Sequence, residues 1–153
     1  MRRYLVVANQ TLGGDQLLEK LRERMEAGPS HFHVLVPATP VDQLEPHLVY
    51  QDPTKGGPKA SAEELGWAAA RQRLHEELLR LRRLGAEVDG EVGEADPVAA
   101  IKEVLSSQQV DEIILSTLPQ RRSRWLARDL PSRVQRDFGL PVTHVVSEPG
   151  API

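Results

Sequence analysis

Short runs of apolar residues alternate along this chain with stretches in which apolar residues recur every three or four positions. The runs are rich in valine, isoleucine and leucine. Strands that are buried on both faces of a sheet have this composition, whereas amphipathic helices have the longer period. The pattern predicts buried strands at residues 4–8, 31–37, 110–115 and 141–146.

The first two predicted helices have clear boundaries. One carries a leucine stripe from Leu17 and ends before Gly28-Pro29, a pair that terminates helices. The next begins at Ser61, where Ser-Ala-Glu-Glu forms a capping box, and ends before Gly85. We expect this second helix to bury a stripe made of Trp67, Ala70, Leu74, Leu78 and Leu81.

Two further helices are predicted in the second half of the chain. Asp96-Pro97 supplies a cap and a first-turn proline for the third helix, whose apolar stripe starts at Val98. The fourth helix is basic, and Pro131 must kink it or restart it because proline lacks the backbone N–H of a helix interior.

Residues 86–92 have a different pattern, since small or apolar residues alternate there with acidic ones. Charged side chains protect the open edge of a sheet against pairing with other chains. We therefore expect an edge strand that carries Glu87, Asp89 and Glu91.

The order of these elements is strand, helix, strand, repeated to a fifth strand, which predicts a parallel sheet with helices on both faces. The expected fold class is a single three-layer α/β/α domain with five parallel strands. Ligands of such sheets bind beyond the carboxyl ends of the strands. The residues at these ends include Asn9, Pro37, Ser116 and Thr117.

Composition narrows the functional classes. The chain has 153 residues, which is the size of one domain, and 40% of them are hydrophobic. A net charge of -3 argues against general nucleic-acid binding, which favours a basic surface. The chain has no cysteine for disulfides, thiol catalysis or thiolate metal sites, and no apolar run of membrane-spanning length. We expect a cytoplasmic protein that contacts neither nucleic acid nor membrane.

Two segments fall outside the regular pattern. Residues 38–60 contain four prolines and two glycines and predict a long loop. The proline-rich end predicts a domain over residues 1–147 and a frayed tail over residues 148–153.

Several fragments together resemble the universal stress proteins. The sharpest is Val92-Gly-Glu-Ala-Asp-Pro97, which is followed by Ile101 and by Asp111-Glu-Ile-Ile-Leu115. Val134 and the closing Pro141-Val142 strand extend the likeness, in the same order and spacing. The resemblance implies an adenine nucleotide alpha hydrolase-like fold with strand order 3-2-1-4-5 and a homodimer formed through the fifth strand.

The chain departs from this family where many members bind ATP. Their motif after strand four has the form G-x2-G-x9-G-[S/T], whereas this chain has Ser116 and Pro119 in place of the first two glycines. The family's aspartate at the end of strand one is Asn9 here. Glycine permits a close approach of backbone to phosphate that proline blocks, so we do not expect ATP to bind in the usual way.

The loop after the fourth strand suggests another ligand. Its arginines stand at the start of a helix, where free N–H groups and the helix dipole favour an anion. A solvated basic helix face is the alternative interpretation. With the neighbouring strand ends, the candidate anion or nucleotide site comprises Asn9, Pro37, Ser116, Thr117, Arg121, Arg122, Ser123 and Arg124.

The remaining histidines and tryptophans do not indicate a catalytic or metal-binding site. His31 and His33 share a strand face but have no evident third metal ligand, and His144 has no catalytic partner in the pattern. We expect structural roles for all three and no metal site. Trp67 and Trp125 are expected to be packing anchors.

The resulting expectation is a non-enzymatic universal-stress-type binding or regulatory module. No cofactor is assigned, although a phosphate-bearing small molecule fits the arginines. One alternative is an ATP-binding member with a divergent phosphate loop and slow hydrolysis, and another is a structural dimeric partner of a second protein. The predicted dimer interface is the uncharged edge Val142, Thr143, His144, Val145 and Val146.

Overall fold

A computed structural model describes residues 1–39, 61–119, 125 and 129–148 of the chain. Its five strands form one parallel sheet in the order β3-β2-β1-β4-β5, which confirms the predicted topology. The strands are β1 (Arg2–Val7), β2 (Ser30–Pro37), β3 (Glu87–Gly93), β4 (Glu112–Thr117) and β5 (Val142–Val146).

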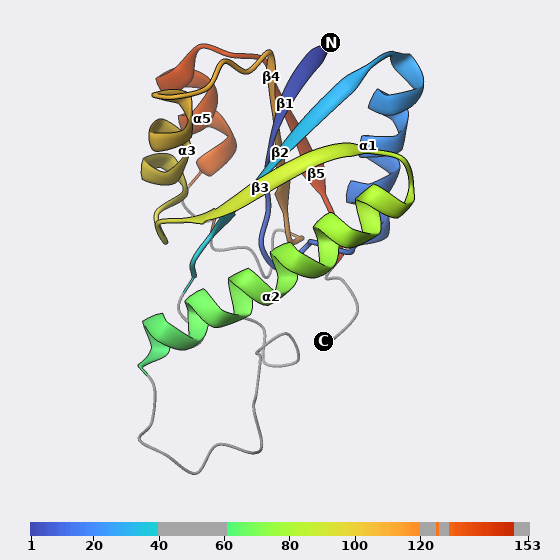
Figure 1. Ribbon diagram of the computed structural model, residues 1–153. Helices are drawn as coiled ribbons and strands as arrows, with labels where there is room; N and C mark the ends of the chain where they lie inside the picture. Colours follow the sequence, from blue (N-terminus) through green and yellow to red (C-terminus); the bar gives the residue numbers. More distant parts are fainter. Residues whose placement is uncertain (40–60, 120–124, 126–128, 149–153) are drawn as a thin grey trace.

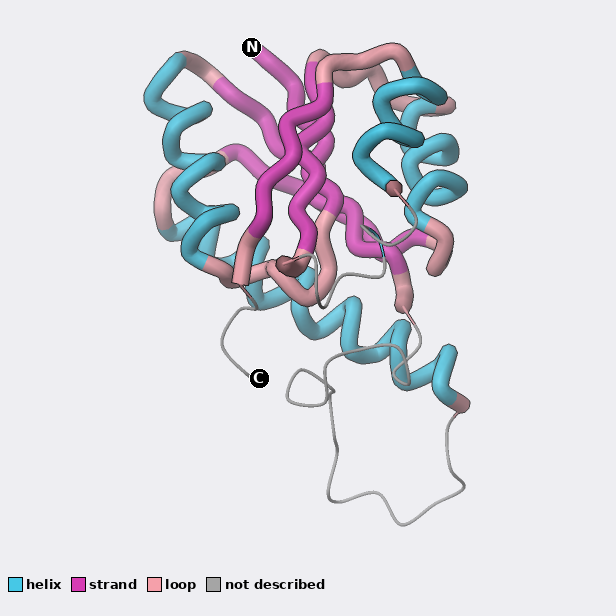
Figure 2. Tube along the Cα trace, turned by 180° about the vertical axis from the view of Figure 1, so that it is seen from behind, coloured by secondary structure: helices cyan, strands magenta, loops and turns pink. Residues whose placement is uncertain are grey.

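In the described part of the chain, four helices connect these strands and cover both faces of the sheet (Figures 1 and 2). The side chains of β1 alternate between two buried clusters, because successive residues of a strand face opposite sides. One cluster lies under α1 and α2, and the other lies under α3 and α5. The helices are α1 (Asp15–Ala27), α2 (Ala62–Arg83), α3 (Pro97–Leu105) and α5 (Leu130–Phe138).

The local signals explain most helix boundaries. The Ser61 hydroxyl accepts a hydrogen bond from the Glu64 N–H at 3.1 Å, which confirms the predicted cap of α2. Pro97 occupies the first turn of α3, although the Asp96 side chain makes no capping bond. Pro131 occupies the first turn of α5, so the helix restarts at this proline.

The predicted buried stripe of α2 is partly wrong. Trp67 is 38% exposed rather than packed as an anchor. The other four predicted residues do contact the core: Ala70 and Leu81 are buried, and Leu74 and Leu78 pack against them. The charged residues Arg73 and Glu77 are buried on α2 as well. Polar partners on the loop after β1 stabilise them there, as described below. The hydrophobic stripe therefore predicted most of its core contacts on α2 but not the burial of Arg73 and Glu77.

The two edge strands differ as predicted. On β3, carboxylate oxygens of Asp89 and Glu91 lie 2.8 and 2.9 Å from Nδ1 and Nε2 of buried His33. His33 therefore ties β2 to β3, which supports the structural role expected of it. On β5 the described side chains carry no ionised carboxylate or ammonium group, and Val146 is 48% exposed.

Candidate functional site

The carboxyl ends of β1 and β4 meet at the point where the strand order reverses. The chain leaves β1 toward β2 on one side, whereas β4 pairs with β1 on the other. Open parallel sheets bind ligands at such a switch point. The polar residues around these two strand ends are therefore the candidate site.

A hydroxyl pair bridges the two strand ends. Thr11, just after β1, and Ser116, in β4, bring their side-chain oxygens within 2.7 Å, and both residues are 1% exposed. Each hydroxyl thus has a partner inside the protein. The bridge crosses the switch point from one side to the other.

Asn9 is also fully engaged. Its Nδ2 donates to the Pro37 carbonyl at 2.8 Å, and its Oδ1 accepts from Arg73 Nη1 at 2.8 Å. Asn9 and Arg73 are buried, and burial lowers the pKa of the Arg73 guanidinium to about 10. The guanidinium remains charged at neutral pH and lies beneath the ends of β1 and β2.

The loop between β1 and α1 is attached to α2 by a second buried charge. Gly13 N–H donates to a carboxylate oxygen of Glu77, and Arg80 donates to the other carboxylate oxygen at 3.1 Å. Arg80 also donates to the Gly13 carbonyl at 3.2 Å. Gly13 has φ of 83°, a left-handed conformation that favours glycine.

The segment after β5 closes over the start of α1. A Cβ on Gly14 would lie 2.5 Å from both the Glu148 carbonyl and the Ser147 hydroxyl, so only glycine fits. The Gln16 side chain accepts from Ser147 Oγ and from Glu148 N, each at 3.1 Å. The first turn of α1 is therefore covered by the chain beyond β5.

Thr117 ends β4 next to the open edge of the sheet. Its hydroxyl lies 2.8 Å from His144 Nε2 on β5, and Thr117 is 1% exposed. Burial lowers the pKa of His144, which favours the neutral imidazole at neutral pH. His144 has this hydroxyl as its partner, in line with a structural role.

The structure thus brings together half of the predicted site. Asn9, Pro37, Ser116 and Thr117 lie at adjoining strand ends, whereas residues 121–124, with the three arginines and Ser123, lie outside the described residues. Sequence analysis missed Thr11, Arg73, Glu77 and Ser147. Arg73 and Glu77 stand four positions apart, and this spacing was the one available signal that they share a helix face.

No metal centre or membrane segment is found in the described part of the chain. No group of three or more histidine, aspartate or glutamate side chains in these residues is arranged to hold a metal ion. Among the same residues, no helix has the length and apolar character needed to cross a membrane.

Comparison with known proteins gives a structural likeness only. No protein-family model matches this sequence, and no curated protein matches it by sequence. A universal stress protein from Archaeoglobus fulgidus has a similar structure, with a TM-score of 0.54 over 95% of this chain and 93% of that one. The two sequences are 16% identical. The chain therefore has the universal-stress-protein fold.

Proposed function

We propose that this chain is a non-enzymatic, universal-stress-type binding module for a small anion, and that it does not bind ATP in the usual manner of that family. The observation that carries this proposal is the Thr11–Ser116 bridge across the switch point, at 2.7 Å. Both hydroxyls are buried and bonded to each other, so a ligand must break this pair to enter there.

The neighbouring groups strengthen the argument against an ordinary ATP site. Asn9 donates from its amide nitrogen to Pro37 and accepts from Arg73 with its amide oxygen, so contacts within the protein fix the orientation of this side chain. An Asn9 side chain thus held cannot replace the carboxylate that the resemblance implies at this position. Pro119 blocks the close backbone approach that a glycine would give a phosphate.

The proposed anion site combines the end of β4 with the residues that follow it in the sequence. It comprises Thr117, Arg121, Arg122 and Arg124. Arginine offers a planar, permanently charged fork that grips a phosphate or sulfate with two hydrogen bonds. Such bonds contribute about 1.5 to 3 kcal/mol each at best, so we expect affinities between about 1 mM and 1 μM.

The anion site can be tested by measuring the thermal stability of the protein in the presence of phosphate, sulfate and nucleotides. The parent should gain stability from anions, whereas an Arg121→Ala, Arg122→Ala double variant should not. A matched control is the Arg133→Ala, Arg136→Ala double variant, which removes the same charge from α5. Equal stabilisation of all three proteins by every anion would leave a solvated basic face as the correct interpretation.

A structural partner role is the second candidate, and a specific observation favours it. The described strand ends are filled by side chains bonded to one another, as in a domain that has no ligand pocket there. If no anion or nucleotide stabilises the parent protein, this candidate replaces the first. The denatured, purified protein should then release no small molecule on chromatography and mass spectrometry.

The proposed oligomer is a homodimer formed through β5. This strand lies at an open edge of the sheet and lacks the acidic residues that protect β3. Two-fold pairing of the strand with its copy would satisfy the unpaired backbone groups on both chains.

The side chains suited to testing this dimer are those that point away from the core. Val146 is 48% exposed, whereas Val145 is buried and Thr143 donates to Glu112 at 2.6 Å. Val146→Lys should therefore yield a monomer by sedimentation without loss of packing. Leu79→Lys, at an exposed position of α2, is the control and should remain a dimer. A parent protein that sediments as a monomer at about 50 μM, above typical dimer dissociation constants, contradicts the proposal.

A further inference from the structure

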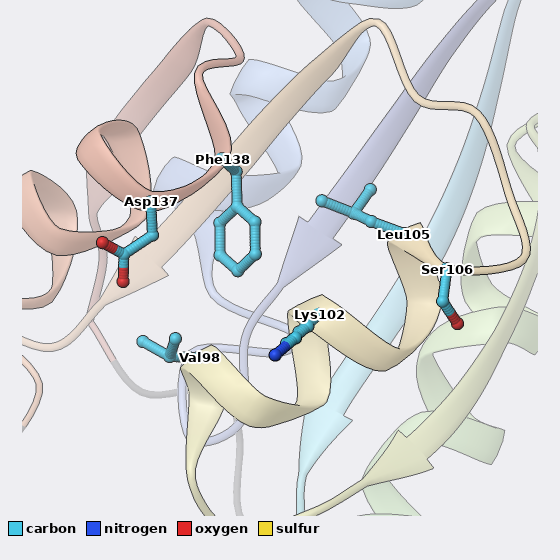
Figure 3. A pocket seen from close by; sticks show the side chains of 6 residues that line it. All are labelled: Val98, Lys102, Leu105, Ser106, Asp137 and Phe138. Carbon is cyan, nitrogen blue, oxygen red and sulfur yellow. The ribbon is translucent and has the colours of Figure 1, made fainter.

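A hollow of about 590 Å³ lies between α3 and α5, away from the candidate site at the carboxyl ends of the strands. Helices of a parallel sheet run opposite to its strands, so the last residues of both helices lie toward the amino ends of the strands. Residues from the last turn of each helix line the hollow (Figure 3). Its lining residues are Val98, Lys102, Leu105, Ser106, Asp137 and Phe138.

The hollow has an apolar floor. Val98, Leu105 and Phe138 are half-buried against the core under α3 and α5, and each keeps part of its surface open. Figure 3 shows the Phe138 ring reaching from α5 toward α3, between Asp137 and Leu105. An aromatic ring flanked by aliphatic side chains favours an apolar or aromatic group.

Charges of opposite sign stand on the two helices that form the hollow. Lys102 of α3 is exposed and has no ion-pair partner among the described residues. Asp137 of α5 has one partner, Arg136, at 3.4 Å, and the Arg136 side chain is 72% exposed. Exposed pairs of this kind contribute little, so the Asp137 carboxylate can accept another cation.

The size of the hollow favours a small molecule over a protein. Small-molecule sites occupy about 300 to 1,000 Å³, a range that contains the volume of this hollow. Stable protein interfaces use about 20 to 30 residues on each side, far more than the lining of this hollow provides. Its surface is therefore matched to a compact ligand.

We infer that this hollow binds a small zwitterion with an aromatic or branched apolar body, such as an apolar α-amino acid. Lys102 pairs with the ligand carboxylate, and Asp137 pairs with its ammonium group. The apolar body packs on Phe138 and Leu105. Neither an anion nor a cation alone satisfies both charges. This site is separate from the proposed anion site at the carboxyl end of β4, and the two proposals are tested independently.

The first measurement follows the backbone amides of the full chain by NMR during titration. The probes are L-phenylalanine, phenylethylamine and 3-phenylpropionate, which carry both charges, the ammonium alone and the carboxylate alone. L-phenylalanine should shift resonances of the lining residues. Each single-charge probe should bind more weakly than L-phenylalanine, by a factor of about ten or greater. Absence of shifts with millimolar L-phenylalanine, or equal binding of all three probes, overturns the inference.

The second measurement uses charge reversal, which separates recognition from folding because both side chains are exposed. Lys102→Glu and Asp137→Lys should each weaken L-phenylalanine binding about tenfold, and the combined variant should recover it with the charges exchanged. Glu103→Lys, on the same helix but outside the lining, should bind like the parent. A combined variant that binds no better than the single variants overturns the inference.

Discussion

β1 and β4 carry a buried polar cluster at each of their two ends, and the two clusters are built differently. At the amino end, the Glu112 carboxylate accepts from Arg24 at 2.9 Å, Arg2 at 3.4 Å and Thr143 at 2.6 Å. At the carboxyl end, the bridge between Thr11 and Ser116 joins two neutral hydroxyls.

The electrostatics of the two ends follow from this difference. Burial raises the pKa of Glu112, but hydrogen bonds from Thr143 and Arg24 outweigh burial and leave that pKa below its usual value. The hydrogen bond between Arg24 and Glu112 also raises the pKa of Arg24. At the carboxyl end, Arg73 donates to a neutral amide, and burial lowers its pKa to about 10.

The two clusters should contribute unequally to the stability of this pair of strands. A charge-paired cluster is costly to break, because a buried charge then loses its partner. Neutral hydrogen bonds contribute only about 1 kcal/mol each, so the hydroxyl bridge is the weaker of the two clusters. The amino end therefore fixes β4 and β5 against α1 more firmly than the hydroxyl bridge holds the carboxyl ends together.

The largest expected effect comes from breaking the charged cluster. Glu112→Ala should lower the free energy of unfolding by about 3 kcal/mol, because it removes the buried carboxylate that Arg24, Arg2 and Thr143 share. Thr143→Val removes one hydrogen bond and should cost only about 1 kcal/mol. Urea denaturation measures both, and equal losses would contradict the charge-paired description.

The same cluster should make stability depend on pH in acid. The folded-state pKa of Glu112 lies below its unfolded value, so its contribution is complete above about pH 4.3 and is lost as pH falls through the folded pKa. The parent should lose more stability than Glu112→Gln between about pH 5 and pH 2. Parallel curves for the two proteins would contradict this assignment.

A smaller effect is expected at the carboxyl end. Arg73→Met keeps the apolar stem but leaves the Asn9 oxygen without its donor, which should cost about 2 kcal/mol. Trp67→Met, on the exposed side of α2, is the control and should change stability by less than about 0.5 kcal/mol. A larger loss of stability for Trp67→Met than for Arg73→Met would show that Trp67, and not Arg73, faces the core.

The smallest effect belongs to the hydroxyl bridge. Ser116→Ala should cost about 1 kcal/mol, because it leaves the buried Thr11 hydroxyl unpaired. Adding Thr11→Val should cost less than the sum of the two single changes, since both partners are then apolar. Additive losses in this double-variant cycle would mean that the two hydroxyls do not interact.

Sequence patterns were sufficient for the sheet and insufficient for the site. Continuous apolar runs and the acidic alternation of β3 predicted the strands and one edge correctly, because the burial of a strand is reflected in its own residues. The strand order was predicted from the resemblance to the universal stress proteins. The burial of the charged face of α2 was not predictable from the residues of that helix alone. Arg73 and Glu77 are buried because Asn9 and Gly13, far away in sequence, supply their partners.

The likeness in fragments also predicted the shared fold but could not reveal what closes the strand ends. Ser116 was identified as a departure from the glycine motif, yet its partner Thr11 lies 105 positions away. Pairs of this kind depend on tertiary structure. The arginines at positions 121, 122 and 124 remain a prediction, because they lie outside the described residues.

The most direct test of the central claim is a calorimetric titration of the parent protein with Mg-ATP. The buried bridge between Thr11 and Ser116, the engaged Asn9 amide and Pro119 all oppose the usual phosphate and adenosine contacts. We predict a dissociation constant weaker than about 1 μM, which corresponds to less than about 8 kcal/mol of binding free energy. Tighter binding than this would contradict the account.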